Sequence, residues 1–400
     1  MFTEHQLEKY AEVLLWGMKA ARSDPFDSGE IVLIRYDLAG LRLTEILYEK
    51  LLREGINPVQ RINGSPRMEH AFFSLAEEPQ LTFIPPGEEE LLRRLNGSIA
   101  LLAPESLTHL QHIDPSRIGK TVLAKKKLRD ILDERENQGL FGWTLCLLPT
   151  PALAESAGLS QEAYAEQIVK ACYLDHEDPV AEWRKIFAKA GEIKERLNEM
   201  HIEELRVQSD RCDLLVTPGS QRQWVGVSGH NIPSFEIFTS PDWRGTQGVF
   251  FMDQPSFRSG NLVKNLRLEF RDGKVSDVQA EVGEDFVKKQ LEIDHNACKL
   301  GEFSLTDKRF SRIESFMAHT LFDENFGGDF GNCHIALGAS YAETYAMGGK
   351  NLDDDKKMHL GFNDSALHWD LVNTEPKTVR AKLRGGEERI IYQDGSFCLE

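Results

Sequence analysis

The sequence predicts an α/β fold in which an N-terminal domain with a mostly parallel sheet precedes a larger, mixed α/β C-terminal domain. Three observations support this prediction. A chain of 400 residues is too long for one ordinary hydrophobic core. In its first 150 residues, apolar runs alternate with segments of helical period, which is typical of parallel β–α–β units. After residue 203, strands become more frequent and hairpin signals occur.

The N-terminal elements follow this alternation in order. Apolar residues between Leu7 and Met18 recur at spacings of three and four and predict a helix. The apolar run 30–36 predicts a buried strand, and the helix after it turns Leu43 and Leu51 inward. Further strands are predicted at 58–62, 81–84, 98–102 and 140–148, and a further helix at 88–95. The sequence has neither GxGxxG nor GxxxxGK[ST], so a nucleotide-binding function has no support.

The remaining predicted elements lie in the second domain. Residues 151–202 are expected to be helical, with Ser160 as an N-cap and an amphipathic helix over 179–200. The Asp-Gly pairs at 272–273 and 394–395 predict hairpins, and a helix after Gly283 is expected to end near His295. We place the domains at 1–150 and 151–400. The boundary lies within 105–200, because the helical stretch suits either domain.

Composition excludes several classes of partner. The formal net charge of −17 argues against nucleic acids and anionic membranes as partners. The six cysteines form no CxxC pair, which argues against a zinc finger or a disulfide framework. The N-terminus lacks a signal-peptide pattern, and the longest apolar stretch, 140–154, is too short to span a bilayer. We therefore expect a cytoplasmic protein.

Metal-ligating residue types gather in four short segments of the C-terminal half. Glu236 lies between aromatic residues in an extended stretch, where a buried carboxylate is costly unless it is paired or binds a metal. Glu302 is a lone acid at the start of an apolar strand. Taken alone, either residue is more typical of an exposed glutamate on a strand.

The other two segments add imidazole. His334 follows a glycine-rich stretch and has apolar neighbours, a setting that also suits an ordinary core histidine. His368 and Asp370 are two positions apart, so on a strand both side chains point the same way. This spacing is common by accident. Together the segments offer two histidines, at least three carboxylates and Tyr341, a mixture that suits zinc, cobalt or manganese. Two such ions can hold a bridging hydroxide and polarise a carbonyl.

At these segments the sequence resembles the M29 family of metallopeptidases, the group of aminopeptidase T, AmpS and PepS. The motifs NIPSFEIFTSP, GEFSL, TLFDEN, HIALGASY and SALHWD match in order and spacing. The N-terminal LYEKLLREGINPV unit also resembles the first domain of the family, so the likeness covers nearly the whole chain.

The resemblance implies a site and a reaction. It implies metal ligands at Glu236, Glu302, His334, His368 and Asp370, with Glu302 as the bridging carboxylate. Tyr341 would orient a ligand or stabilise the oxyanion, and Glu324 of TLFDEN would be a further catalytic acid. Asp329 competes with Glu324 for that position, because the segment between Glu324 and His334 departs from the family pattern.

The implied activity is that of a metallo-aminopeptidase, a hydrolase with a binuclear metal centre. Two divalent ions (zinc, cobalt or manganese) would activate a water that attacks the N-terminal peptide bond of short peptides, and Glu302 or Glu324 would shuttle the proton. The resemblance also implies a homodimer. Two alternatives remain open: a metal-dependent amidase acting on small non-peptide amides, and an inactive relative that serves as a binding protein.

Overall fold

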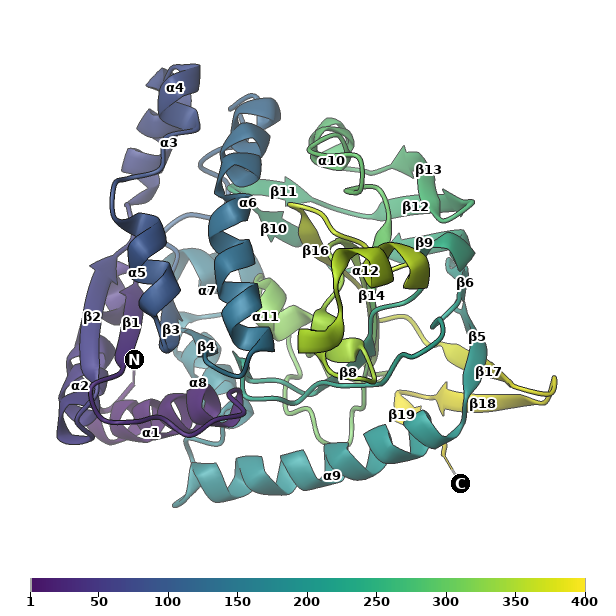
Figure 1. The fold of residues 1–400 in the computed structure, drawn as a ribbon, viewed down its shortest axis with the longest axis horizontal. Coiled ribbons are helices and arrows are strands. Elements are labelled where there is room, and N and C mark those ends of the chain that lie inside the picture. Colours follow the sequence, from purple (N-terminus) through teal and green to yellow (C-terminus); the bar gives the residue numbers. More distant parts are fainter. Residues whose placement is uncertain (1, 400) are drawn as a thin grey trace.

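The N-terminal part of the chain forms a parallel five-stranded sheet flanked by helices, as predicted. The computed structural model describes residues 2–399. The strand order is β2-β1-β3-β4-β7, and every pairing in this sheet is parallel. Figure 1 shows this layer on one side of the molecule. Its elements are α1 (Glu4–Ala20), β1 (Ile31–Tyr36), α2 (Leu41–Arg53), β2 (Asn57–Ile62), α3 (Pro66–Leu75), α4 (Glu78–Leu81), α5 (Glu88–Arg94), β3 (Gly97–Leu102), α6 (Pro115–Asn137) and β4 (Gly142–Leu147).

The fifth strand of this sheet comes from the second half of the chain. Three helices follow β4 and lead to the later strands: α7 (Pro151–Ala157), α8 (Gln161–Ala171) and α9 (Pro179–Glu199). Ser160 caps α8 as predicted, with its hydroxyl accepting from the backbone N–H of Ala163. β7 (Asn231–Ile232) then returns to pair with β4. The strand that carries Glu236 therefore starts beside the parallel sheet. The predicted division at residue 150 stays a prediction.

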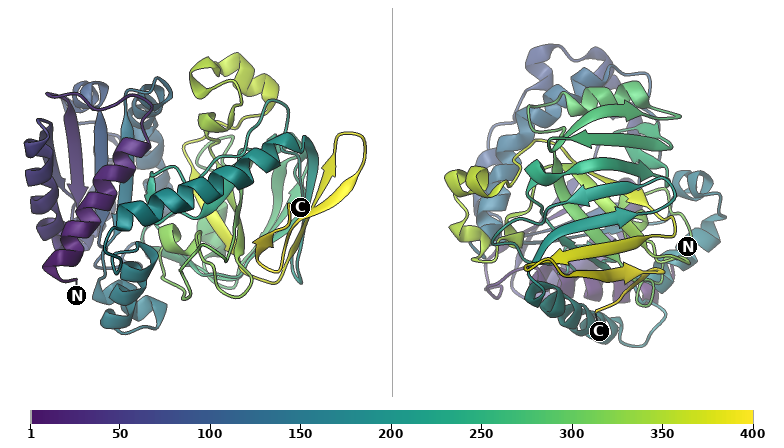
Figure 2. Two further views of the ribbon diagram at one scale, coloured as in Figure 1. Left: turned by 90° about the horizontal axis from the view of Figure 1, so that it is seen from below. Right: turned by 90° about the vertical axis from the view of Figure 1, so that its right-hand side faces the viewer.

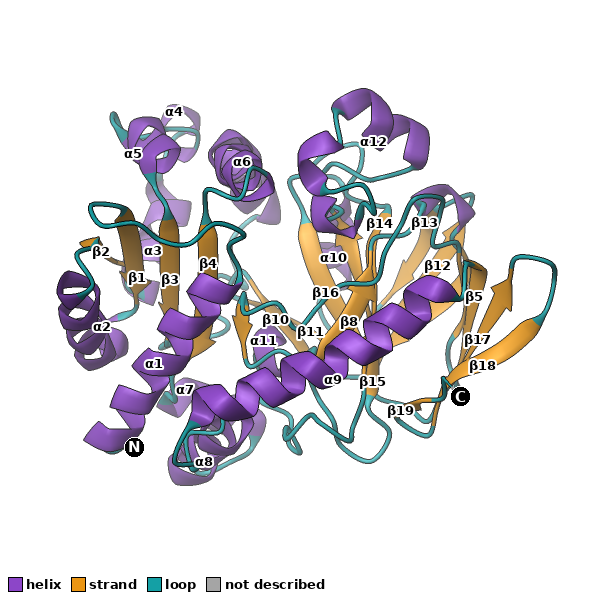
Figure 3. Cartoon of the chain, turned by 60° about the horizontal axis from the view of Figure 1, so that its bottom comes forward, coloured by secondary structure: helices purple, strands orange, loops and turns teal. Residues whose placement is uncertain are grey.

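Two antiparallel sheets make up the rest of the chain (Figures 2 and 3). One has eight strands in the order β13-β12-β9-β6-β5-β17-β18-β19, and the other has four in the order β16-β15-β14-β8. Both predicted Asp-Gly hairpins are present, at β12–β13 and β18–β19. The strands of the larger sheet are β5 (Ile202–Gln208), β6 (Asp213–Val216), β9 (Gln247–Met252), β12 (Leu266–Arg271), β13 (Lys274–Gln279), β17 (Thr378–Leu383), β18 (Glu388–Gln393) and β19 (Ser396–Phe397).

The four-stranded sheet carries the candidate site. Its strands are β8 (Glu236–Thr239), β14 (Leu300–Thr306), β15 (Asn332–Gly338) and β16 (His368–Asn373). The remaining elements are the two-stranded β10 (Ser256–Arg258) and β11 (Asn261–Val263), and the helices α10 (Glu284–Leu291), α11 (Thr320–Asp323) and α12 (Asp354–Leu360). The chain also contains four short 3-10 helices within residues 2–399: η1 (Leu38–Gly40), η2 (Trp243–Gly245), η3 (Ala342–Thr344) and η4 (Gly349–Asn351).

One predicted strand is wrong. Residues 81–84 do not form a strand. Instead α4 ends at Leu81, and its first turn is set by Pro79 near the helix start and a capping box between Glu77 and Gln80. Phe83 then lies in a loop and is 60% exposed, so the apolar run that suggested a strand is not a core segment.

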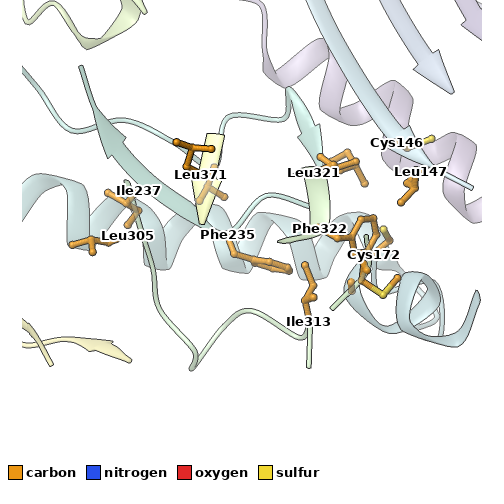
Figure 4. Close-up of a cluster of buried hydrophobic side chains, with 14 of the residues drawn as sticks. Cys146, Leu147, Cys172, Phe235, Ile237, Leu305, Ile313, Leu321, Phe322 and Leu371 are labelled. Carbon is orange, nitrogen blue, oxygen red and sulfur yellow. The ribbon is translucent and has the colours of Figure 1, made fainter. Parts of the chain in front are cut away.

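A single large core joins the parallel layer to the antiparallel sheets. Figure 4 shows Cys146 and Leu147 of β4 close to Leu321 and Phe322 of α11, with Phe235 beside them. The same buried cluster continues through apolar residues of β8, β14, β15 and β16. Helix α9 runs along the bottom of Figure 1 and contacts α1. Within residues 2–399, no helix has both the length and the apolar character needed to cross a bilayer.

Candidate metal centre

Strand register explains why residues far apart in sequence meet on one face of the four-stranded sheet. Glu302 pairs with Ala336, which pairs in turn with Asp370 on the next strand. Directly opposed residues in antiparallel strands point to the same face, so Glu302 and Asp370 share a face with only a methyl group between them. His334 lies two positions before Ala336 and joins that face.

The other ligating side chains reach the same face. On β8, Glu236 pairs with Thr306, which alternation places on the same side as Glu302. His368 lies opposite Gly338, whose φ is 99° and where a Cβ would collide with the carbonyl of Leu367. Only glycine adopts this conformation easily. Small residues on β15 therefore leave the space that the larger ligating side chains occupy.

The first group of converging side chains consists of Glu236, Glu302 and His334. The Nε2 atom of His334 lies 3.1 Å from Oε1 of Glu302 and 3.2 Å from Oε2 of Glu236. All three residues are buried. A buried imidazole facing two carboxylates is a donor set that suits zinc and similar divalent ions.

The second group consists of Glu302, His368 and Asp370. The Nε2 atom of His368 lies 3.3 Å from Oδ1 of Asp370 and 3.6 Å from Oε2 of Glu302. Glu302 is thus common to both groups, and each of its oxygens faces a different group. Glu302 can therefore offer one oxygen to each group.

The carboxylates in this region lack enough cationic partners. Burial raises the pKa of Glu302 to about 7, and the nearby Glu236 adds to the rise, while His334 and His368 oppose it. Burial would also raise the pKa of Asp370, but His368 outweighs it and lowers that pKa to about 2. The hydrogen bonds to Glu236 and Glu302 overcome burial and raise the pKa of His334. Divalent cations would neutralise the excess negative charge, so the residues present fit such ions.

Glu324 lies at the edge of this group, and Asp329 does not. Glu324 is buried at the C-cap of α11, and its Oε1 accepts from the side-chain amides of Asn231 (3.0 Å) and Asn325 (3.3 Å). Burial, reinforced by the charges of Glu236 and Asp370, raises its pKa well above the usual value. Asp329 is exposed and lies outside the cavity described below. Of these two acids, the structure therefore brings only Glu324 to the site.

Tyr341 lies at the rim of the site. Its ring contacts the imidazole of His368, with ring centroids 4.7 Å apart, and also packs against Phe238. Its backbone N–H donates to the hydroxyl of Ser240 at 2.9 Å, which holds the loop after β15 in place. The structure thus places the phenol beside the second group, where it can reach a bound ligand.

Residues around the ligating set orient His368. Its Nδ1–H donates to the carbonyl oxygen of Ala339 at 2.9 Å, which leaves Nε2 free to face Asp370 and Glu302. Arg258, from β10, donates to the backbone carbonyl of His368 at 2.8 Å. Arg258 is half-buried, and desolvation lowers its pKa to about 10 although the charge of Asp370 opposes the shift. No motif in the sequence singled out Arg258, because its partner is a backbone atom contributed by another strand.

A cavity of about 260 Å³ opens onto the ligating residues. The parallel layer contributes Leu102, Trp143 and Leu145 to its wall, and the loop and helix around His319 close another side. Burial lowers the pKa of His319 to about 4, so this imidazole is neutral. The cavity therefore lies between the two halves of the chain.

Four residues of the cavity wall were missed by the sequence analysis. Glu136, Trp143, His230 and Glu343 all line it. His230 stands directly before the NIPSFEIFTSP motif, which was the one available signal. Glu136 and Trp143 belong to the first half of the chain, where no local pattern connects them with the site.

Comparisons with known proteins agree with this geometry. The family model described as "Thermophilic metalloprotease (M29)" matches residues 3–397. Aminopeptidase AmpS of Bacillus subtilis is 28% identical over 78% of this chain and 79% of its own length. Aminopeptidase T of Thermus thermophilus is 26% identical, and 99% of each chain is covered. The solved structure of wild-type AmpT from Thermus thermophilus superposes with a TM-score of 0.79 over 98% of each chain, at 23% identity, a likeness of fold.

The expected α/β fold and the expected family are thereby confirmed. The predicted enzyme class agrees with the relatives, which carry the name aminopeptidase. On the family model, which spans almost the entire chain, this protein belongs to the M29 family of metallopeptidases, hydrolases that depend on divalent metal ions.

Proposed function

We propose that this protein is an aminopeptidase that removes the N-terminal residue of short peptides at a centre of two divalent ions. Glu236, His334 and Glu302 would hold one ion, and Glu302, His368 and Asp370 the other. The observation that supports two ions is the position of Glu302, whose oxygens face one group each. Its relatives are named aminopeptidases, which supports the reaction class.

Bound ions would supply Lewis-acid polarisation of the scissile carbonyl and an acidified water. The protein's own residues would do the rest. Glu324 would carry the proton from the attacking water to the leaving amine, since its pKa is raised and Oε1 is already held by two amides. Oε2 is then the oxygen that exchanges the proton. The phenol of Tyr341 would donate a hydrogen bond to the oxyanion.

The shape of the cavity supports short peptides as substrates. Its volume of about 260 Å³ accommodates a few residues and no folded chain. Its walls come from both halves of the protein.

We also propose that the protein forms a homodimer in the cytoplasm. Helix α3 presents an outward apolar stripe of Met68, Phe72 and Leu75, which are 66%, 38% and 78% exposed. Such a stripe is typical of a surface covered in an assembly. The six free cysteines suit a reducing compartment. Light scattering would test the dimer, and a mass equal to one chain would contradict it.

Hydrolysis of aminoacyl-p-nitroanilides and short peptides tests the activity. Metal-free protein would be reconstituted separately with cobalt, zinc and manganese, beside a Glu302→Gln variant and an Asp329→Asn control. We expect metal-dependent release of the N-terminal residue by the wild type and the control, and none by Glu302→Gln. Hydrolysis of simple amides alone would indicate an amidase. No hydrolysis by folded, metal-loaded protein would indicate a binding protein.

A further inference from the structure

The cavity extends beyond the ligating residues to a second polar region formed by Glu136, His230 and Glu343. None of these three side chains belongs to either group of candidate metal donors, within which the donor atoms lie within 4.8 Å of one another. Apolar side chains line the same cavity, among them Leu145 and Phe238. The region therefore offers polar atoms to a substrate group other than the scissile bond.

Glu136 and His230 form an ion pair. The Nε2 atom of His230 lies 2.8 Å from Oε1 of Glu136, and the indole N–H of Trp143 donates to Oε2 at 3.1 Å. Burial opposes a charge on His230, but the hydrogen bond to Glu136 prevails and raises its pKa. The Trp143 ring stacks on His230 with centroids 4.4 Å apart. This pair forms a rigid wall with little net charge.

Glu343, in η3, has no such partner. Among residues 2–399, its carboxylate forms no hydrogen bond, and no cationic group lies within ion-pair distance of it. His230 and Lys194 lower its pKa, but both are engaged elsewhere: His230 pairs with Glu136, and Lys194 donates to the carbonyl oxygen of Gly226 at 2.7 Å. Burial is the largest influence, and it raises the pKa of Glu343 despite these two charges.

Acidic residues predominate in the cavity wall. In the part of the chain that the structure describes, neither lysine nor arginine lines it, whereas six acidic residues do. The positive charge of two divalent ions would offset the negative charge of the acids that hold them. The negative charge of Glu343 would remain. A positively charged substrate group is the partner that this carboxylate lacks.

We infer that Glu343 selects substrates whose N-terminal residue is lysine or arginine. This inference rests on the aminopeptidase function proposed above. The α-amine of a substrate is two bonds from the scissile carbon and stays near the metal-ligating residues. A lysine or arginine side chain would lay its methylene groups along Leu145 and Phe238 and bring its charge to Glu343.

Kinetics with matched substrates test the inference. Lysyl- and norleucyl-p-nitroanilide share the α-amine and the methylene chain and differ in the terminal charge. We expect kcat/KM to favour the lysyl substrate in the wild type. Glu343→Gln should lower kcat/KM for the lysyl substrate by about 10- to 100-fold, the worth of one charge-assisted hydrogen bond, and change that for norleucyl by less than about twofold. Glu195→Gln, an exposed glutamate on α9, is the matched control and should change neither.

Calorimetric binding of lysinamide and norleucinamide to metal-loaded protein separates this inference from the proposed function. Preferential binding of lysinamide, lost in Glu343→Gln and partly retained in Glu343→Asp, would support the subsite even if no substrate were hydrolysed. Equal weakening of both ligands would show that Glu343 contacts the α-amine and would overturn the inference. Equal kcat/KM values of an active wild type for the lysyl and norleucyl substrates would also overturn the inference. That result would not contradict the proposed aminopeptidase activity.

Discussion

Replacing Glu302 with glutamine should have opposite effects on the metal-free and metal-loaded protein. The substitution keeps the shape of the side chain and removes its charge. In the metal-free protein, burial beside Glu236 raises the pKa of Glu302 from 4.5 to about 7. That rise corresponds to about 3 kcal/mol of unfavourable interaction once the carboxyl is ionised. Less complete hydrogen bonding of the glutamine amide in this buried site offsets about 1 kcal/mol. The metal-free variant should therefore be more stable than wild type by about 1 to 2 kcal/mol above pH 7.

The pH dependence gives the sign of this effect. Below pH 4.5 the carboxyl is protonated in both the folded and the unfolded protein, so it contributes nothing to the difference. Between 4.5 and about 7 the unfolded chain releases this proton first, so the metal-free wild type loses stability as the pH rises. The advantage of the variant should grow across this interval and stay constant above it.

Binding of metal should make the wild type more stable than Glu302→Gln, which reverses the order of the metal-free proteins. Glu302 is the only one of the five ligating residues common to both groups, so its loss weakens both sites. We expect the metal affinity to fall by about 100-fold or more, equivalent to about 2.7 kcal/mol. Thermal unfolding followed by fluorescence, with and without zinc at pH 8, would measure both effects. A metal-free variant less stable than wild type, or a zinc-induced rise in Tm as large as that of wild type, would refute the reasoning.

Three further predictions concern residues around the ligating set. Glu324→Gln should lower kcat by about 100-fold or more while metal binding, measured by calorimetry, is retained. Asp329→Asn should leave kcat unchanged. Equal effects of the two substitutions on kcat would contradict the role of Glu324 as the proton carrier. Arg258→Met should weaken metal binding by about tenfold, because the hydrogen bond that fixes the backbone of His368 is lost, and an unchanged affinity would count against this role. Burial lowers the pKa of His319 from 6.5 to about 4, so the wild type should lose stability as the pH falls through this interval. The loss should be smaller in His319→Asn, as urea unfolding at pH 7 and pH 4.5 would show.

The sequence predicted most elements with a clear apolar period. The strands at 30–36, 98–102 and 140–148 and the helix at 179–200 are present close to the expected bounds. The prediction was wrong at 81–84, where apolar residues lie in a short helix and a loop. Helix α6 was not predicted at all, because charged residues occur on most of its sides and hide the apolar period.

The candidate site also has features that the sequence predicted and features that it did not. The candidate ligands were identified through the resemblance of five short motifs to the family, since each histidine or carboxylate taken alone also suited an ordinary core or surface residue. The choice between Glu324 and Asp329 was not readable, because both lie within ten residues of His334. Tertiary contacts decided it: Asn231 and Asn325 hold Glu324 inward, while Asp329 remains in water.

The sequence by itself determined the types of the candidate ligating residues, the extended segments that carry them and the resemblance to the family. Local periodicity and short motifs carry this information, because each depends on neighbours within a few residues. Only the tertiary structure decided that Glu302 faces both groups, that Arg258 donates to the backbone of His368, and that Glu343 lines the same cavity. These properties depend on strand register and on contacts between the two halves of the chain, and no local segment encodes either.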